Sequence, residues 1–534
     1  MAGLRDDDSC AGLRKLLADI GVGGSPAEEI QKRHSILLRA GSWSSTTKQN
    51  RQNSTALAAL TMHHACPDTI VTTEQDDFDE QVERSWSSRV WVKPGAFFRP
   101  HNASEVSIGL RIARYFHTRF SIRSGGHSPL QSLGDAASQD YIVFSLERLN
   151  GIKLYSSTLF AEVGTGCRWG EVYRALEPAD LAVSGGHYAD VGVGGYMQGG
   201  GSSFFLGSHG WSCDTVRNFE VVLSDGRIVN ANEESHPDLY WALKGGASNF
   251  GIVTRYGMDT IPLSPTSSWG GNLIYDSSQV GASIAAIAEM QSNSHETDPV
   301  ADVAFLVLKE PCTGLDIAAA ALFHPNHSVE EAHHPKVLDP LFNVPATRDT
   351  TRIQPLAKMA EEAGAGLIFK KGNRYNYGQI TVGVDAKLYA AIYERWRVHY
   401  ASLETIPGIC LTLSYNPIPA KAIVASRTRG SNPFGIKEIA QCRIGLDHGW
   451  TRAEDDEKVL AADVAFLNDI ADLARSYGLL QEYIGMNNAG EHQDVMGHYG
   501  KENLERMRNV SRKYDVDQVF QELCAGPFKL MKRN

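Results

Sequence analysis

The chain has 534 residues, of which 42% are hydrophobic and 21% are charged, and its formal net charge is −11. This composition is ordinary for a globular protein and excludes a largely disordered, collagen-like or coiled-coil chain. An acidic chain without a cluster of lysine and arginine is also a poor candidate for binding nucleic acid or an anionic membrane. We therefore expect either an enzyme that acts on a small molecule or an acidic binding protein.

The cysteines and the N-terminus narrow the class further. The eight cysteines are scattered and none forms a C-x-x-C pair, so they predict neither a metal site nor a disulfide framework. The chain begins Met-Ala-Gly-Leu-Arg followed by three aspartates, unlike a signal peptide. The longest uncharged run, residues 191–213, contains eight glycines and many polar residues, so it predicts no membrane span. These features predict a cytoplasmic protein without a membrane partner.

The first half of the chain predicts an N-terminal extension followed by an α+β unit. Residues 1–85 are polar and predict short helices and loops, whereas residues 86–264 predict short strands separated by glycine. Ser224-Asp225-Gly226 lies between two of these strands and predicts a hairpin. The expected strands are 90–92, 120–123, 141–146, 160–163, 219–223, 227–229 and 251–256. The expected helices are 105–116, with Ser104 as its N-cap, 170–176 and 238–244.

A boundary is expected near residues 261–265, which contain two prolines. Beyond it, residues 265–485 predict a second α+β domain with longer strands and longer helices, and 486–534 form a C-terminal segment. The expected strands are 269–275, 300–308, 379–384 and 410–415. The expected helices are 283–291, 386–402, 458–477 and 501–513, of which 458–477 has the clearest apolar face.

Three glycine-rich clusters stand out in the first domain. The first, Arg123-Ser124-Gly125-Gly126-His127-Ser128, follows a strand, so its amide groups could form a nest for an anion. The second, residues 163–173, has a glycine spacing that is not the dinucleotide fingerprint. The third, residues 184–201, is almost free of charge, and a flat ligand lying against it would supply the missing core. The alternative is that these are ordinary tight turns with a surface histidine.

In the order of these motifs the sequence resembles the FAD-linked oxidases of the vanillyl-alcohol oxidase and p-cresol methylhydroxylase superfamily, in particular the berberine-bridge-enzyme-like branch of fungi. The C-terminal residues 499–520 carry a further part of that resemblance. The resemblance implies an α+β, two-domain flavoprotein fold. It comprises a bipartite FAD-binding domain, formed by 86–264 and a returning segment 486–534, and a substrate domain, 265–485, with an antiparallel sheet backed by helices. Residues 1–85 would pack on the FAD-binding domain.

The resemblance also implies how FAD is held. Residues 123–128 would wrap its pyrophosphate, and His127 would carry the flavin covalently through the 8α-methyl group. Other residues expected to line the cofactor are Gly164, Gly186, Val191, Gly192, Gly195, Ile252 and Val253. Tyr188 stands where many relatives have a second flavin-linking cysteine, so we expect a single link through histidine, and Cys167 is not that cysteine. Val191 stands where relatives that react with oxygen carry a small branched residue, which favours an oxidase over a dehydrogenase.

The catalytic residues are less determined. The candidates are His187, beside the flavin loop, Tyr415 and Tyr377 on expected strands, and Asn487 in an Asn-Asn pair where many relatives have Asn-Tyr. Tyr375 and Glu310 are further candidates for the base. For each of these side chains the alternative is a packing or surface role.

The resulting hypothesis is an FAD-dependent oxidoreductase that acts on a small organic metabolite of fungal secondary metabolism. Substrate would give a hydride to flavin N5, and O2 would take the electrons to form H2O2. One alternative is a carbohydrate or alcohol oxidase. Another is a non-redox cyclase that uses the flavoprotein pocket, and a third is a binding protein that has lost its cofactor. The sequence leaves the oligomeric state and the identity of the substrate open.

Overall fold

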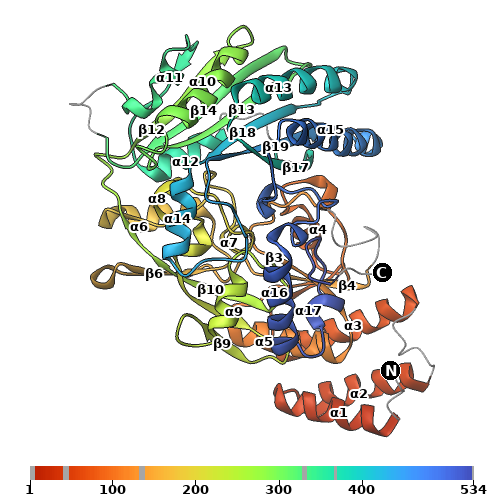
Figure 1. Cartoon of the computed structure of the whole chain (residues 1–534). Helices are drawn as coiled ribbons and strands as arrows, with labels where there is room; N and C mark the ends of the chain where they lie inside the picture. The colour runs from red at the N-terminus through yellow and green to blue at the C-terminus, as the bar shows by residue number, and fades with distance from the viewer. Residues whose placement is uncertain (1–5, 40–46, 131–138, 328–332, 366–369, 532–534) are drawn as a thin grey trace.

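The computed structural model describes residues 6–39, 47–130, 139–327, 333–365 and 370–531. Its elements form two lobes that are stacked one above the other in Figure 1. The lower lobe contains the glycine clusters and the three smaller described sheets, and the upper lobe contains one large sheet with long helices on its outer face. This mixed arrangement agrees with the expected α+β class.

Three helices precede the first lobe: α1 (Asp6–Asp19), α2 (Gly24–Arg39) and α3 (Lys48–Ala65). They are longer than the short helices expected for this region. Thr47 caps α3 by accepting a hydrogen bond from the amide of Asn50, and the apolar faces of all three helices join a core shared with α5 (Ala103–Tyr115). In Figure 1, α1 and α2 form a hairpin at the lower edge of the molecule.

The first sheet has the order β1-β2-β4-β3, and its last three strands are parallel. Its strands are β1 (Ile70–Val71), β2 (Ala96–Phe98), β3 (Arg119–Arg123) and β4 (Tyr141–Ser145). Residues 90–92 do not form the expected strand, because Ser88–Val90 is a single 3-10 turn, and α4 (Phe78–Glu83) precedes it. The N-cap of α5 is Asn102 rather than Ser104, since the Asn102 side chain accepts from the amide of Glu105 at 2.9 Å.

The second sheet is antiparallel with the order β5-β6-β10-β8-β9. Its strands are β5 (Ile152–Tyr155), β6 (Phe160–Gly164), β8 (Val216–Val222), β9 (Ile228–Ala231) and β10 (Ile252–Asp259). The expected hairpin around residues 224–226 is confirmed as the β8–β9 pair. β7 (Leu181–Ala182) and β11 (Ile261–Pro262) pair separately. The helices here are α6 (Trp169–Leu176), α7 (Val193–Gln198), α8 (Leu206–His209) and α9 (Pro237–Leu243).

The upper lobe is built on an antiparallel sheet of nine described strands, with the order β15-β12-β14-β13-β18-β19-β17-β20 and β16 beside β12. Its long strands are β12 (Trp269–Asp276), β13 (Asp302–Glu310), β14 (Leu315–His324), β17 (Arg374–Gly383), β18 (Leu411–Ile418) and β19 (Gln441–Trp450). Its short strands are β15 (Arg348–Asp349), β16 (Arg352–Ile353) and β20 (Leu480–Gln481). The sequence prediction missed two of the long strands, β14 and β19, and all three short strands.

Helices α10 (Val280–Asn293), α13 (Ala386–Tyr400) and α15 (Asp456–Ser476) cover one face of this sheet and enclose its core (Figure 1). The other face meets the lower lobe, where α12 (Leu356–Ala365) packs against α6 and α14 (Ala420–Thr428) packs against α8, whereas α11 (Asp339–Phe342) packs against α10 on the helix side. An antiparallel sheet with helices on one face matches the substrate-domain architecture that the family resemblance implies.

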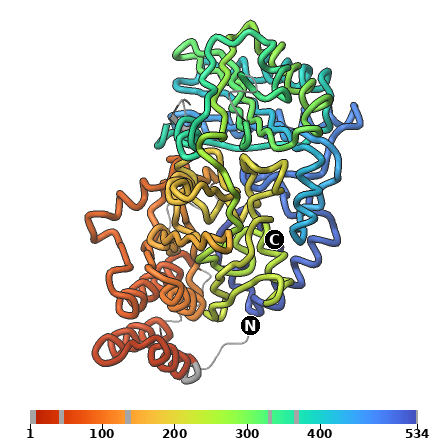
Figure 2. The backbone as a smooth tube through the Cα atoms, turned by 90° about the vertical axis from the view of Figure 1, so that its left-hand side faces the viewer, coloured from red at the N-terminus to blue at the C-terminus, as the bar shows by residue number. Residues whose placement is uncertain are grey.

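The C-terminal segment returns to the lower lobe, as Figure 2 shows by the blue tube beside the yellow-green one. It contains α16 (Lys501–Tyr514) and α17 (Val519–Glu522). The backbone of Cys524 forms an isolated parallel β-bridge with Phe120 of β3, and the side-chain amide of Asn249 donates to the carbonyl of Phe528 at 2.9 Å. Among the described residues, no helix is long and apolar enough to cross a membrane.

Candidate active site and cofactor cavity

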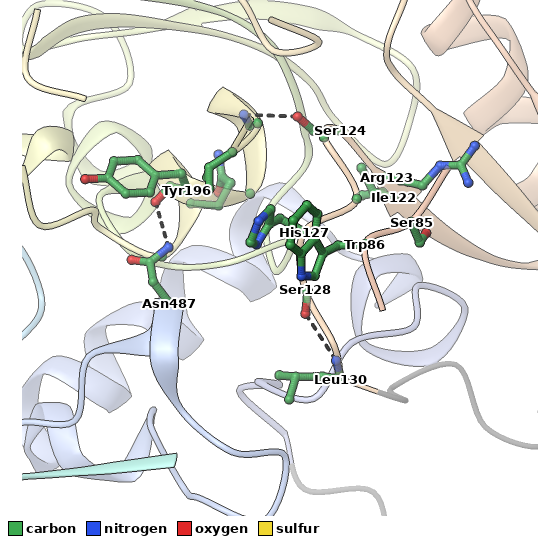
Figure 3. Close-up of a pocket in the computed structure, with 18 of the residues that line it drawn as sticks. Ser85, Trp86, Ile122, Arg123, Ser124, His127, Ser128, Leu130, Tyr196 and Asn487 are labelled. Atoms are coloured by element: carbon green, nitrogen blue, oxygen red, sulfur yellow. Dashed lines mark hydrogen bonds between the residues drawn. The ribbon is translucent and has the colours of Figure 1, made fainter. Parts of the chain in front are cut away.

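A cavity of about 730 Å³ lies between the glycine clusters of the lower lobe and the inner face of the large sheet. Its volume is in the upper part of the range of roughly 300–1,000 Å³ that small-molecule sites occupy. Figure 3 shows the end formed by the loop of residues 123–128, with Trp86 beside His127 and with Tyr196 and Asn487 farther along. The walls therefore come from parts of the chain that are far apart in sequence.

The loop of residues 123–128 offers unpaired amide groups to this cavity. Gly126 has a φ of +72°, which favours glycine, and its carbonyl accepts from the amide of Trp86 at 2.8 Å. The amides of residues 125–128 donate no hydrogen bond to another described residue. Successive free N–H groups in a tight turn form an anion-binding concavity. The loop is thus suited to a phosphate group.

The first and third glycine clusters touch through their backbones. A Cβ atom on Gly125 would lie 2.5 Å from the Cα of Gly192, and the amide of Gly194 donates to Ser124 Oγ at 3.2 Å. Ser124 Oγ in turn donates to the carbonyl of Thr165 in the second cluster at 2.6 Å. The three clusters that the sequence singles out therefore meet in one place.

Most of the residues expected to line the cofactor do line the cavity: Ser124, Gly125, Gly126, His127, Ser128, Gly186, Val191, Gly192, Gly195, Ile252 and Val253. A Cβ atom on Gly195 would meet nothing within 4 Å, so this glycine faces open space. Gly164 differs, because it is not among the lining residues and its added Cβ would lie 2.0 Å from the carbonyl oxygen of Leu149. That glycine is required by close backbone packing.

The side chain of His127 is held by stacking. The Trp86 indole lies over it with ring centroids 4.7 Å apart and planes at 19° (Figure 3). Burial, followed by the nearby charge of Arg168, lowers the pKa of His127 to about 4. The imidazole is therefore neutral at physiological pH, and neither ring nitrogen has a hydrogen-bond partner on another described residue.

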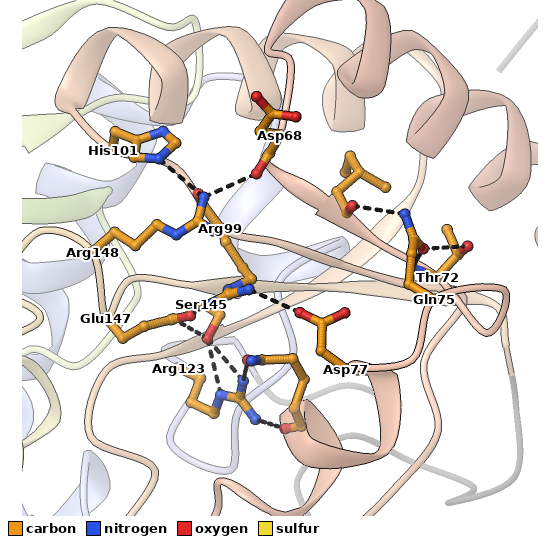
Figure 4. A network of polar contacts seen from close by, with 12 residues as sticks. Asp68, Thr72, Gln75, Asp77, Arg99, His101, Arg123, Ser145, Glu147 and Arg148 are labelled. Carbon is orange, nitrogen blue, oxygen red and sulfur yellow. Dashed lines mark hydrogen bonds and ion pairs between the residues drawn. The ribbon is translucent and has the colours of Figure 1, made fainter.

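Arg123 belongs to this loop, but its guanidinium points away from it. Nη2 donates to Ser145 Oγ at 2.8 Å and to Gln81 Oε1 at 3.1 Å, and burial lowers the pKa of Arg123 to about 10. Figure 4 shows that Ser145 leads on to Glu147, which accepts from Arg99 Nε at 2.7 Å. The donors of Arg123 thus fix the base of the loop, while the free backbone amides face the cavity.

The opposite wall presents an acidic group. Asp447 of β19 lies directly across from Tyr377 of β17 in the sheet register, and both side chains line the cavity. Burial raises the pKa of the Asp447 carboxyl to about 6, although a hydrogen bond from Asn488 and nearby positive charge act against this. Burial, and the neighbouring Asp447 charge, also raise the pKa of Tyr377. A carboxyl group with such a pKa can exchange a proton near neutral pH.

His187 lies in the third glycine cluster and also lines the cavity. Its Nε2 is 2.7 Å from Asp302 Oδ2 at the start of β13, so the pair joins the two lobes. The ring of Phe204 packs against the imidazole with centroids 4.4 Å apart. Asp302 thereby orients one of the predicted catalytic side chains.

The other predicted catalytic residues are placed differently. Tyr415 is fully buried on the helix side of the sheet, where its hydroxyl donates to the carbonyl of Tyr389 at 2.9 Å, so it has no access to the cavity. Asn487 does line the cavity, but its side chain is engaged by the lower lobe. Its Nδ2 donates to the carbonyl of Tyr196 at 3.0 Å, and its Oδ1 accepts from the backbone amide of Gly201 at 3.0 Å. Tyr375 lines the cavity, whereas Glu310, at the outer end of β13, does not.

Sequence reasoning missed Asp447, Arg443 and Trp86, all of which line the cavity. A signal for the first two was present in β19. Apolar and other residues alternate there, which is the period of a half-buried strand. The apolar positions are Cys442, Ile444 and Leu446, and the positions between and after them are Arg443, Gly445 and Asp447. No comparable signal marks Trp86, which lies in an irregular segment.

These features suit FAD, a cofactor with a pyrophosphate and a flat ring. The free amides suit a pyrophosphate, Gly195 leaves an open face for a flat ring, and Gln198 Oε1, on the cavity wall, is buried without a partner in the described part of the chain. In line with this, residues 94–232 match a family described as an FAD binding domain. Within the described residues, no group of three or more histidine, cysteine, aspartate or glutamate side chains could hold a metal.

Known proteins are similar to this chain over most of its length. The FAD-dependent monooxygenase sdcF of Emericella nidulans is 32% identical over 460 residues, which cover 85% of this chain and 94% of sdcF. The structure of 6-hydroxy-D-nicotine oxidase from Arthrobacter nicotinovorans superposes with a TM-score of 0.70 at 18% identity and covers 85% and 96% of the two chains. A berberine bridge enzyme variant in complex with (S)-reticuline gives 0.67 at 17% identity and covers 87% and 97%.

The chain belongs to the family of FAD-dependent enzymes that includes sdcF, and its fold is that of the berberine-bridge-enzyme-like proteins of the vanillyl-alcohol oxidase and p-cresol methylhydroxylase superfamily. The resemblance inferred from the ordered motifs is thereby confirmed, and so is the expected two-domain flavoprotein fold. Binding of FAD and oxidoreductase chemistry follow from this membership.

Proposed function

We propose that the protein is an FAD-dependent oxidase that uses O2 as electron acceptor. Its substrate is a small organic metabolite of fungal secondary metabolism. The observation that carries this proposal is the single cavity that joins His127 and the free amides of its loop to Asp447 on the sheet. His127 and residues 125–128 would hold the cofactor at the first end, in the same cavity that Asp447 lines. The named function of sdcF as a fungal FAD-dependent monooxygenase supports flavin chemistry with oxygen.

His127 carries the covalent link in this proposal. A nucleophilic imidazole must be neutral, and the low pKa of about 4 meets that requirement. Trp86 holds the ring by its face and leaves both ring nitrogens at the edge accessible. Tyr188 lines the cavity at the place of the second linking residue of other family members and provides no thiol, so one link is expected.

The bound FAD supplies a hydride acceptor, and its electrons pass to O2 to give H2O2. Asp447 is the proposed base, because its carboxylate lies in the cavity and its pKa of about 6 leaves it ionised at neutral pH. It takes the proton of the substrate's hydroxyl or amine group while the adjacent C–H bond delivers the hydride. Tyr377, directly opposite Asp447, and His187, oriented by Asp302, are proposed to orient the substrate.

The oxygen half-reaction tests the proposal without knowledge of the substrate. Holoenzyme reduced anaerobically by light and EDTA is mixed with aerated buffer, and flavin absorbance and peroxide are followed. We expect reoxidation within seconds and one H2O2 per flavin. Reduced enzyme that persists for minutes in air but reoxidises at once with a quinone would instead establish a dehydrogenase.

Three further outcomes distinguish the remaining chemistries once a substrate has been identified. Incorporation of ¹⁸O from labelled O2 into product, with little peroxide, would establish a monooxygenase. Conversion of substrate under anaerobic conditions without bleaching of the flavin would establish a non-redox cyclase. A carbohydrate oxidase would show peroxide formation with sugars in the same assay.

A further inference from the structure

Arg443 is a cation on the cavity wall that no part of the proposed chemistry uses. It lies on β19 four residues before Asp447, so both side chains are on the same face of the sheet. Its Nη2 donates to Ser202 Oγ at 2.9 Å, and the charge of Asp447 acts on it, although no ion pair joins it to a carboxylate of the described residues. Its Nε is buried without a partner in the described part of the chain.

A half-buried guanidinium without an anion is costly, because it has lost water and gained little in exchange. Apart from Asp447, whose charge acts on Arg443 without an ion pair between these two described side chains, the charged groups of the cavity are accounted for. His187 is paired with Asp302, Glu361 accepts from Arg174 at 2.5 Å, and Arg123 is bonded to Ser145 and Gln81. Asp190 is exposed to solvent. Among the described side chains that line the cavity, Arg443 is therefore the cation with the least charge compensation from the protein.

A second unpaired polar atom lies beside Arg443. Thr381 of β17 is directly opposite it in the sheet register, and Thr381 Oγ1 is buried without a partner in the described residues. On the lower lobe Ser202 follows the glycines of the third cluster, so Arg443 reaches across the boundary between the lobes. The guanidinium is thus held at one point and keeps most of its donors for a ligand.

We propose that Arg443 and Ser202 form a subsite for an acidic group of the substrate, a carboxylate or an equivalent organic anion. The planar guanidinium matches a carboxylate in a bidentate arrangement. Four residues along a strand separate Arg443 from Asp447 by about 13 Å between Cα atoms. The substrate is therefore an elongated organic acid that is anchored at its acidic end and oxidised at the other. This substrate class rests on the proposed function, in which Asp447 marks the reacting end.

The test compares biphenyl-4-carboxylate with its neutral amide by isothermal titration calorimetry on the oxidised holoenzyme. We expect the carboxylate to bind at least tenfold more tightly than the amide. Arg443→Gln should remove this preference, and Arg443→Lys should keep part of it, because a lysine retains the charge but not the planar fork. Arg33→Gln, which removes an exposed charge on α2, is the matched control and should leave the preference unchanged.

Equal affinities for acid and amide in the wild-type protein would overturn the proposal even if Arg443→Gln does not fold. So would an Arg443→Gln variant that keeps its flavin and its full carboxylate preference. If that variant instead loses affinity for sulfite, which adds to the flavin, while its carboxylate preference is intact, Arg443 serves the cofactor and not the substrate. A carboxylate preference in an enzyme that stays reduced in air would refute the oxidase function alone.

Discussion

The indole of Trp86 lies nearly parallel to the imidazole of His127, with ring centroids 4.7 Å apart. The backbone of Trp86 also ties the two lobes together. Its amide donates to the carbonyl of Gly126 at 2.8 Å, and its carbonyl accepts from Gly372, just before β17, at 2.9 Å. The residue expected to carry the flavin is thus positioned by a segment outside the glycine motifs.

His127→Ala should release the flavin from covalent attachment. Acid-precipitated wild-type protein should stay yellow and fluorescent, whereas the variant should lose its flavin to the supernatant. Trp86→Ala should give a mixture of covalently bound and released flavin, because the imidazole of His127 loses the ring that fixes its plane. Trp86→Phe should retain a larger covalently bound fraction. Wild-type protein that releases all its flavin on precipitation would contradict the covalent assignment.

Substitution by alanine should have different effects on protein stability at Gly192, the N-cap of α7, and at Gly195 within that helix. Gly192→Ala brings a methyl group to about 2.5 Å from Gly125 Cα and should destabilise the protein with or without FAD. Gly195→Ala meets no protein atom within 4 Å, so it should leave the apoprotein stable and weaken flavin retention. Thermal unfolding of both forms, together with flavin content, checks the pair. Equal effects on apoprotein stability would show that Gly195, like Gly192, is required by packing within the protein.

The sequence predicted the cofactor side of this site better than the catalytic side. Gly125, Gly192 and Gly194 could be found because close backbone contact leaves glycine as the required residue. Tyr415 was misplaced, although Leu411 and Leu413 share its face of β18 and alternation alone assigns it to the core. Asp447 was missed because its strand was not predicted, and its raised pKa depends on burial in the folded protein, against which a hydrogen bond from the distant Asn488 acts. Such burial is a tertiary effect that local patterns do not contain.

Cys167→Ser should leave flavin content and absorbance unchanged. The thiol is fully buried beneath the second glycine cluster, and burial raises its pKa to about 12, so it is protonated and unreactive. Peptide mapping checks the prediction directly. A flavin-bearing peptide that contains Cys167 but not His127 would show that the link had been assigned to the wrong residue.

Val191→Ile should slow the reaction of the reduced enzyme with oxygen. Val191 lines the cavity beside Gly192, and the extra methylene would narrow the approach for a small gas molecule. Reduction by substrate should change little, because the substrate lies toward the sheet in the proposed arrangement. Stopped-flow measurement of both half-reactions distinguishes the two effects, and Val253→Ile is the comparison on the β10 side of the cavity. Equal slowing of both half-reactions would indicate a general loss of packing.

Asp447→Asn should lower turnover by about 10²- to 10⁴-fold, the usual contribution of a positioned base. In the wild-type enzyme kcat/KM should rise with pH through about 6, because only the carboxylate accepts a proton. That limb should be absent in the variant. The exposed Asp472→Asn is the control, and its profile should match the wild type.

The same substitution should stabilise the protein at neutral pH. Because the folded protein holds the Asp447 proton more tightly than the unfolded chain does, this carboxyl costs stability as pH rises from about 4 to its folded pKa of about 6. Above that pH the cost is constant, and two pKa units correspond to about 3 kcal/mol as an upper bound. Asp447→Asn should therefore unfold at a higher temperature than the wild type at pH 7.5 and at nearly the same temperature at pH 4. A variant that is less active and also less stable at pH 7.5 would identify Asp447 as a structural residue.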